Sequence, residues 1–355
     1  MVLKTKNSIP LLFILLFCFL ISCNKSSDTN IPDSQSNEQI EDEEEEEIPV
    51  ETFANAVEEF GQLSVSGSKI IDKNSDPVQL RGMSLFWSQW IGKYYNYNTI
   101  KWLKDDWQIN VIRAALAVDH DGYLVNPEVE KAKIIAVIDA AITEGIYVIV
   151  DWHDHEAENH LEEAKTFFAE IAEEYGNYPN IIYETYNEPL DVSWLSVLKP
   201  YHEAVIANIR QHDSDNIVVC GTRNWSQEVN EVVGNKINDP NVVYALHYYA
   251  ATHKQELRDK ATLAINNNIP LFVTEFGTTQ ASGDVEIDEA ESLIWWEFLD
   301  QHKISWCNWS VADKEELSAA LVINASIDGG WSASDITTSG TIVRNEIKTK
   351  NKVYN

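Results

Sequence analysis

Eight short apolar runs, rich in Val and Ile, constrain the fold more than any other feature of the sequence. They cover residues 78–86, 109–116, 146–153, 180–188, 216–222, 242–249, 270–277 and 304–311. Runs this continuous are typical of strands covered on both faces, as in a parallel sheet. Consecutive parallel strands need a long crossover connection, which usually contains a helix.

The segments between the runs carry helix signals. In the segment that begins at Asn126, Pro127 suits the first helical position, three Ile residues recur on one face, and Gly145 marks the end. Residues 162–176 and 287–302 show the same pattern. Eight strands alternating with helices predict an α/β fold, a (β/α)8 barrel that forms one domain over residues 61–355. Residues 63–80 are expected to form a hairpin that closes the barrel floor.

The N-terminus has the pattern of an export signal. Lys4 and Lys6 precede an apolar stretch over residues 10–21, which is shorter than the roughly 20 residues that cross a bilayer. Residues 20–23, Leu-Ile-Ser-Cys, resemble a bacterial lipobox. This predicts a signal peptide over residues 1–22 and a lipidated Cys23 that anchors the exported protein to the cell envelope, at the outer membrane. A plain secretory signal with an incidental Cys is the alternative.

Residues 23–60 are predicted to be a disordered acidic linker, because they lack hydrophobic periodicity. Of the formal net charge of -31, thirteen acids and one Lys place -12 on residues 24–60, and after the +2 of the leader -21 remains on residues 61–355. A body this acidic argues against nucleic acid as a partner, since phosphate contacts need a basic surface. We expect a monomer that meets the membrane only through its lipid.

The chain has four cysteines, of which Cys18 lies in the leader and Cys23 is the expected lipid site. Cys220 and Cys307 each lie within an apolar run, which predicts buried free thiols rather than a disulfide.

Polar and aromatic residues end nearly every strand run. In a barrel of this kind the working residues lie at the C-terminal ends of the strands. These positions hold Arg113, His153, Asn187, Glu188, His247, Tyr249, Glu275 and Trp309. They are expected to surround one mouth.

Two of these residues are carboxylates, Glu188 after the fourth run and Glu275 after the seventh. Glycoside hydrolysis uses two carboxyl groups that flank the scissile bond. A surface turn would explain the sequence Asn187-Glu188-Pro189 by itself. It does not explain Glu275 together with Arg113, so the set favours catalysis.

In this order, the motifs NVIRAAL, VDWH, YNEP, LHYY, VTEFG and NWSVADKEELSAAL resemble glycoside hydrolase family 5, and most closely its bacterial endoglucanase branch. The resemblance covers about residues 80–321. It implies an endo-β-1,4-glucanase that cleaves cellulose-like or mixed-linkage glucan with retention and needs no metal or cofactor.

The same resemblance implies the role of each residue. Glu188 is the expected general acid/base and Glu275 the nucleophile, with their carboxyl groups about 5 to 5.5 Å apart. Arg113 is expected to keep Glu275 ionised and Tyr249 to orient it. Asn187 is expected to bind the sugar 2-hydroxyl. His247, backed by His153, is expected to set the protonation of Glu188.

Substrate contacts follow from the resemblance as well. Trp309 is expected beneath the reacting sugar, joined to Ser310 by a cis peptide bond. Trp90 and Trp225 are expected to stack on sugars on either side of the cleaved bond, and Lys314 and Glu316 are expected polar contacts on the non-reducing side. Phe86 and Ala117 depart from the branch, which commonly has His and Tyr there, so they bear on chain-length preference and glucan identity.

Other interpretations compete with this one. A mannanase, xyloglucanase or xylanase would use the same scaffold, and a surface glycan-binding lipoprotein would use the cleft without cleaving. Arg113 could be a core arginine that pairs with any acid. A zinc hydrolase would use His153, Asp154 and His155, but the two-carboxylate set already accounts for His153. Asp154 and His155 are then expected to be ordinary loop residues.

Overall fold

The computed structural model describes residues 53–354. The expected signal peptide, Cys23 and most of the acidic linker lie outside these residues. The strands are β1 (Ser64–Ser66), β2 (Lys69–Ile71), β3 (Arg81–Leu85), β4 (Val111–Ala117), β5 (Tyr147–His153), β6 (Ile181–Glu184), β7 (Ile217–Cys220), β8 (Val242–Tyr249), β9 (Leu271–Gly277) and β10 (Trp306–Val311). The α-helices are α1 (Ala56–Phe60), α2 (Tyr97–Trp102), α3 (Pro127–Glu144), α4 (Leu161–Tyr175), α5 (Lys199–Ile209), α6 (Arg223–Ser226), α7 (Gln255–Asn266), α8 (Glu289–His302) and α9 (Thr338–Lys350).

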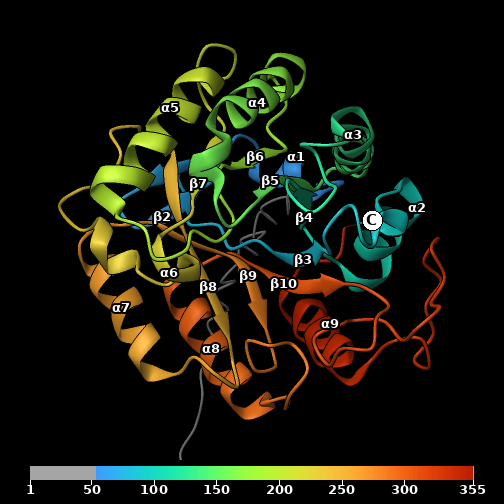
Figure 1. Cartoon of the computed structure of the whole chain (residues 1–355). Helices are drawn as coiled ribbons and strands as arrows, with labels where there is room; N and C mark the ends of the chain where they lie inside the picture. The colour runs from blue at the N-terminus through green and yellow to red at the C-terminus, as the bar shows by residue number, and fades with distance from the viewer. Residues whose placement is uncertain (1–52, 355) are drawn as a thin grey trace, which may run out of the picture. The chain divides into compact units, whose positions relative to one another are not determined.

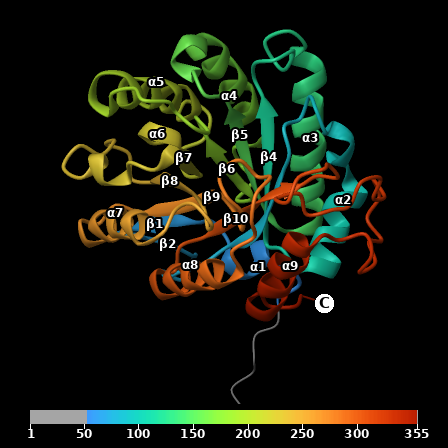
Figure 2. The ribbon, with the colours of Figure 1, turned by 60° about the horizontal axis from the view of Figure 1, so that its bottom comes forward.

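Strands β3 to β10 form a closed parallel barrel in chain order, and β10 pairs with β3 to close it. The predicted (β/α)8 fold is therefore confirmed, and the helices surround the strands (Figures 1 and 2). Every residue of β4, β5 and β9 is buried, as the continuous apolar runs predict for strands covered on both faces. Cys220 and Cys307 are buried free thiols, also as predicted.

The N-terminal segment packs against the floor of the barrel. Strands β1 and β2 form the predicted antiparallel hairpin, and Leu63, Ile70 and Val78 belong to an apolar cluster with inward residues of the barrel strands. Helix α1 lies within the segment expected to be disordered linker. Its Ala56 is buried and the Val57 amide donates to the Gly145 carbonyl at 3.0 Å, so the linker ends earlier in the chain than residue 60.

The crossover helices bury one apolar face each against the strands. In α3, Ile134 and Ile138 are buried, and Gly145 ends the helix in the left-handed conformation. Asn126 precedes α3 but makes no side-chain capping bond, and its side-chain NH2 donates to the Asp121 carbonyl at 3.0 Å. Among the helices of residues 53–354, none combines the length and apolarity needed to cross a membrane.

The connection between β7 and β8 lacks a full crossover helix. It contains only the four-residue α6 and a 3-10 turn over Val229–Val232. Asn224, Trp225 and Ser226 have φ values of 60°, 57° and 55°, which side chains other than Gly rarely adopt. Hydrogen bonds fasten this segment to the loop after β6: the Asn224 and Trp225 amides donate to the carbonyls of Leu190 and Pro189 at 3.1 and 2.8 Å.

Candidate active site

Glu275 lies near the end of β9 and points into the barrel mouth, where it is 4% exposed. It accepts hydrogen bonds from the Arg113 guanidinium at 3.0 Å and from the Tyr249 hydroxyl at 2.8 Å. Gly277 allows this arrangement, because a Cβ there would lie 2.4 Å from the Tyr249 ring. The two contacts expected for Glu275 are both present.

Arg113 is the centre of a buried polar layer beneath the mouth. Its guanidinium binds Glu184 at 2.7 Å, Asp151 at 2.9 Å and the Asn187 side-chain oxygen at 2.6 Å, in addition to Glu275. Sequence reasoning placed Arg113 beside Glu275 but did not identify Asp151 and Glu184, both of which are fully buried. The signal was an acid inside an apolar strand, which a barrel interior tolerates only when the charge is paired.

Glu188 lies beyond the end of its strand, because β6 ends at Glu184 and the chain then turns. The turn can lie against β7 because Gly221 has no side chain: a Cβ there would meet the Tyr186 carbonyl at 2.2 Å. One carboxylate oxygen of Glu188 is 3.0 Å from His247 Nδ1, and the other is 3.3 Å from His155 Nε2. His155 was expected to be an ordinary loop residue, and this contact corrects that expectation.

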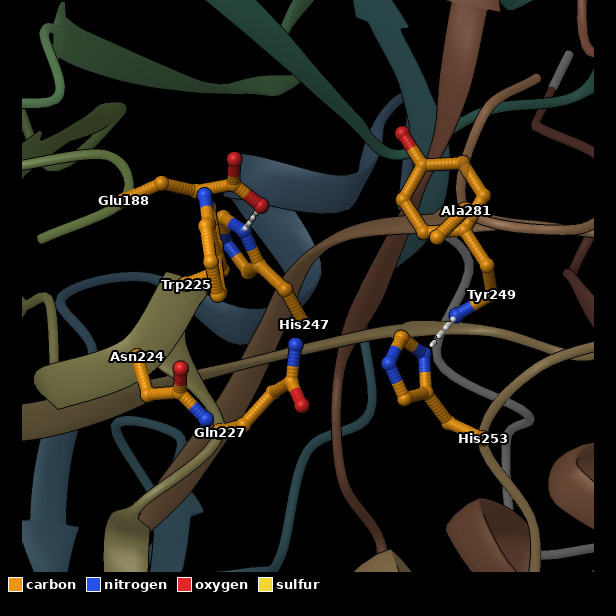
Figure 3. Close-up of a pocket in the computed structure, with 8 residues that line it drawn as sticks. All are labelled: Glu188, Asn224, Trp225, Gln227, His247, Tyr249, His253 and Ala281. Carbon is orange, nitrogen blue, oxygen red and sulfur yellow. Dashed lines mark hydrogen bonds and ion pairs between the residues drawn. The ribbon is translucent and has the colours of Figure 1, made fainter. Parts of the chain in front are cut away.

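The hydrogen bonds of His247 determine which of its nitrogens faces Glu188 with an exchangeable proton. Thr274 donates its hydroxyl to Glu184 at 2.6 Å, so it accepts from His247 Nε2 at 2.9 Å. Nε2 therefore carries a hydrogen in either protonation state. Nδ1 is left as the atom that exchanges a proton with Glu188. Figure 3 shows this contact as a dashed line.

The pKa shifts of Glu188 and His247 differ from those expected for a general acid and its partner. Burial raises the pKa of Glu188, but hydrogen bonds from His155 and His247 outweigh it and lower the pKa to about 2. Burial lowers the pKa of His247, but Glu184 and Glu188 raise it to about 9. The proton of this group therefore lies on histidine, and Glu188 is anionic.

Glu275 shows the opposite shift. Burial and the neighbouring Glu188 carboxylate raise the pKa of Glu275, and His247, Arg113 and Tyr249 offset only part of this effect. Arg113 lowers the pKa of Glu275, which is the expected direction, but it does not outweigh burial and the Glu188 carboxylate. Arg113 instead divides its charge among three buried carboxylates.

The two carboxylates face each other at short range. One oxygen of Glu188, one of Glu275 and one nitrogen of His247 all lie within 4.8 Å of one another. In the described part of the chain, these three residues are also the one cluster with the donor types and spacing of a metal site. The zinc set considered from the sequence is not formed, because His153 binds Asp151, Asp154 binds His160 and His155 faces Glu188.

His153 was expected to support His247, but its hydrogen bond and its ring stacking are with other residues. Its Nδ1 is 2.7 Å from Asp151, and its ring stacks on Trp309 with the centroids 5.1 Å apart. Burial and Arg113 lower the pKa of His153 well below its usual value, so it is neutral. The peptide bond from Trp309 to Ser310 is cis, as the resemblance implied. His153 therefore holds the Trp309 ring at the base of the mouth.

Two adjoining cavities extend from the carboxylates. One, of about 410 Å³, is lined by Glu188, Trp225, His247 and Tyr249 among others (Figure 3). The second, of about 210 Å³, is lined by Phe86, Trp309, Lys314 and Glu316 together with both catalytic candidates. Every residue expected at the mouth except Trp90, Arg113 and Asn187 lines one of the two, and the last two lie beneath them.

Aromatic side chains flank both cavities. Trp225 is 45% exposed beside the first cavity and Trp90 is 56% exposed near the second, where it contacts Phe86 and Trp87. Phe86 packs on Trp309. The Lys314 ammonium lies 4.6 Å from the centre of the Phe86 ring and pairs with Glu316. Ala117 is buried and offers no polar group to a substrate.

Comparison with known proteins agrees with this geometry. Residues 71–315 match the family described as Cellulase (glycosyl hydrolase family 5). The chain is 48% identical over 278 residues to Endoglucanase A of Evansella cellulosilytica, which covers 77% of this chain and 57% of that protein. It is 45% identical over 291 residues to an endoglucanase of Clostridium saccharobutylicum, with 81% and 65% covered. The chain thus spans less than two thirds of either relative.

Solved structures resemble the whole barrel. A protein from Cytophaga hutchinsonii superposes with a TM-score of 0.83 at 54% identity, covering 84% of this chain and 97% of that one. The catalytic domain of the Thermobifida fusca endoglucanase Cel5A superposes with a TM-score of 0.79 at 36% identity, covering 82% and 99%. Because the family match covers most of the chain and these relatives are 36% to 54% identical to it, the chain belongs to glycosyl hydrolase family 5.

Proposed function

We propose that the protein is an endo-β-1,4-glucanase that hydrolyses internal bonds of cellulose-like or mixed-linkage glucans with retention of configuration. The observation that carries this proposal is the approach of the Glu188 and Glu275 carboxylates to within 4.8 Å at the barrel mouth. Retaining enzymes hold the two groups about 5 to 5.5 Å apart, whereas inverting enzymes need about 6.5 to 9.5 Å to admit a water.

The partners of each carboxylate assign the roles. Glu275 is bound by Arg113, which does not release its proton at any relevant pH, and by the Tyr249 hydroxyl. Such a carboxylate is suited to attack. Glu188 is bound by two histidines that can supply and accept a proton. Such a carboxylate is suited to acid/base work, although the proton must move from histidine to Glu188 when substrate binds.

The reaction then proceeds in two steps. Glu275 bonds to the anomeric carbon while Glu188 gives its proton to the leaving glycosidic oxygen, and the C–O bond breaks. Glu188 next takes a proton from water, whose oxygen displaces Glu275 from the same carbon. The Asn187 side-chain oxygen is bound to Arg113, and its buried Nδ2 has no acceptor among the described residues, so it is placed to donate to the sugar 2-hydroxyl.

The cleft explains why internal bonds are the proposed target. Cavities lie on both sides of the carboxylate pair, and exposed Trp90 and Trp225 offer flat surfaces beyond it. A chain can therefore be held on both sides of the cleaved bond. The relatives named above are endoglucanases, which supports a β-1,4-glucan as substrate.

Release of reducing ends tests the proposal. The protein is incubated with carboxymethylcellulose, barley β-glucan, glucomannan, mannan and xylan, beside Glu275→Gln, Glu188→Gln and the exposed-site control Glu297→Gln. We expect activity on the glucans that falls at least about 10³-fold in the two site variants and is unchanged in the control. Activity on mannan or xylan alone would overturn the substrate, and binding without cleavage would make the protein a glycan-binding lipoprotein.

We propose further that the protein is exported and lipid-anchored through Cys23 at the outer membrane of the cell envelope. The support is the sequence pattern alone: two lysines, a short apolar stretch and the lipobox-like residues 20–23. The acidic segment that follows would separate the barrel from the membrane and let it reach a polymer.

A further inference from the structure

The Glu188 carboxylate has two histidine partners of different accessibility. His247 reaches one oxygen from β8 and is 1% exposed. His155 reaches the other oxygen from the loop after β5, and its side chain is 39% exposed. The Glu188 side chain is only 14% exposed, so a more exposed partner gives its proton a further route to solvent. Of these two histidines, His155 is the one in contact with both Glu188 and solvent.

The loop that carries His155 is held in place. Asp154 accepts from the Glu156 amide at 2.9 Å and contacts His160 Nδ1 at 2.7 Å. The His155 carbonyl accepts from the Tyr186 hydroxyl at 2.8 Å. The ring itself lies edge-on to Trp87, with the centroids 5.6 Å apart. Because these bonds fix the backbone around His155, the imidazole contacts Glu188 while its side chain stays partly exposed to solvent.

The charges around His155 favour its protonated form. The Glu188 carboxylate faces it from the loop after β6, Glu275 from β9, and Asp154 from its own loop, while the nearby His153 is neutral. Burial lowers the pKa of His155, but the bond to Glu188 and these carboxylates raise it above its usual value. At neutral pH the pair therefore retains a proton that Glu188 alone would lose.

We infer that His155 is a positioning residue for the acid/base carboxylate. It orients Glu188 from the solvent side, and Glu188 exchanges its proton with water through the His155 imidazole. This rests on the proposed glucanase function. The proton moves from His155 Nε2 to the Glu188 oxygen, leaving neutral imidazole and a carboxylic acid. Glu188 then gives that proton to the leaving oxygen. In the second step Glu188 takes a proton from the attacking water and returns it to His155.

Two substrates separate this role from a structural one. Cellopentaose needs a proton on its leaving oxygen, whereas 2,4-dinitrophenyl β-cellobioside releases a stable anion without one. The kcat/KM of each is measured for the protein, His155→Gln and His155→Leu. The control is His212→Gln, which replaces an exposed histidine outside the His155 loop and outside the residues that line the cleft. Circular dichroism melting shows that each variant is folded.

We expect kcat/KM on cellopentaose to fall about tenfold in His155→Gln and further in His155→Leu, since general acid catalysis contributes roughly 10² to 10⁴ and one of two partners is lost. On the dinitrophenyl substrate the change should stay within about twofold. Since His155 holds its proton to higher pH than usual, its removal should move the alkaline limb on cellopentaose to lower pH. His212→Gln should leave the limb in place.

Equal losses on both substrates, or an unshifted alkaline limb, would overturn the inference while leaving the glucanase proposal intact. An inactive parent protein would instead overturn the proposed function. The two failures are therefore distinguishable.

Discussion

Replacing Arg113 by Met should cost the protein much of its stability. Met has a similar length, so the change removes the charge and its hydrogen bonds with little change in packing volume. Three carboxylates, Asp151, Glu184 and Glu275, then lose a partner at 2.7 to 3.0 Å in a fully buried layer. Removing one partner of a buried ion pair costs about 3 to 5 kcal/mol, because the remaining charge stays desolvated. With about 2 to 4 °C per kcal/mol for a large domain, we expect a fall in Tm of roughly 6 to 20 °C.

The matched control is Arg344→Met on α9. Arg344 also binds a carboxylate with two bonds, to Asp106 at 2.8 and 2.9 Å, but both side chains are about one quarter exposed. Water screens such a pair, so its loss should cost about 1 kcal/mol or less. Thermal melting by circular dichroism compares the two variants with the parent.

The pH dependence sharpens the test. Burial raises the pKa of Glu184, but Arg113 and His247 outweigh burial and lower it below the usual value. A carboxylate with a depressed folded-state pKa adds stability above its unfolded pKa, and this stability is lost as the pH falls through the folded value. The Tm difference between Arg113→Met and the parent should therefore be largest near pH 7 and narrow toward pH 4. A difference under about 3 °C, or one that does not change with pH, would refute the reasoning.

Two further predictions concern Tyr249 and the anchor. Tyr249→Phe removes the hydroxyl that donates to Glu275 at 2.8 Å, a bond that lowers the pKa of Glu275. The acidic limb of the kcat/KM profile should therefore move to higher pH, while kcat/KM falls about tenfold and Tm is unchanged. An acidic limb that does not move would contradict this prediction. Cys23→Ser should shift the protein from the membrane fraction to the soluble fraction of the producing cells, as read by immunoblot, and continued membrane association would argue against lipidation.

The strands could be predicted well because short, continuous Val and Ile runs are characteristic of strands that are buried on both faces. All eight runs contain a barrel strand, and the order of polar residues at their ends placed Glu188, Glu275, Arg113 and Tyr249 in one mouth. Chain order is enough here, because a barrel of parallel strands brings every C-terminal end to the same face.

The partners inside the barrel were harder to predict. Asp151 and Glu184 are single acids within apolar runs, and the sequence does not show which face of a strand points inward or which acid meets Arg113. His155 was missed because it belongs to a loop whose path depends on Asp154, His160 and Tyr186. The direction of the pKa shift of Glu188 depends on these contacts, so it could not be derived from spacing.

The left-handed segment at Trp225 is coupled to the loop that presents Glu188. Its amides are fastened to the carbonyls of Pro189 and Leu190, and the Ser226 hydroxyl donates to the Asn187 carbonyl at 2.8 Å. These carbonyls belong to the short loop that presents Glu188. Three hydrogen bonds thus join the segment that carries Trp225 to the loop that presents Glu188, so a displacement of either segment is transmitted to the other.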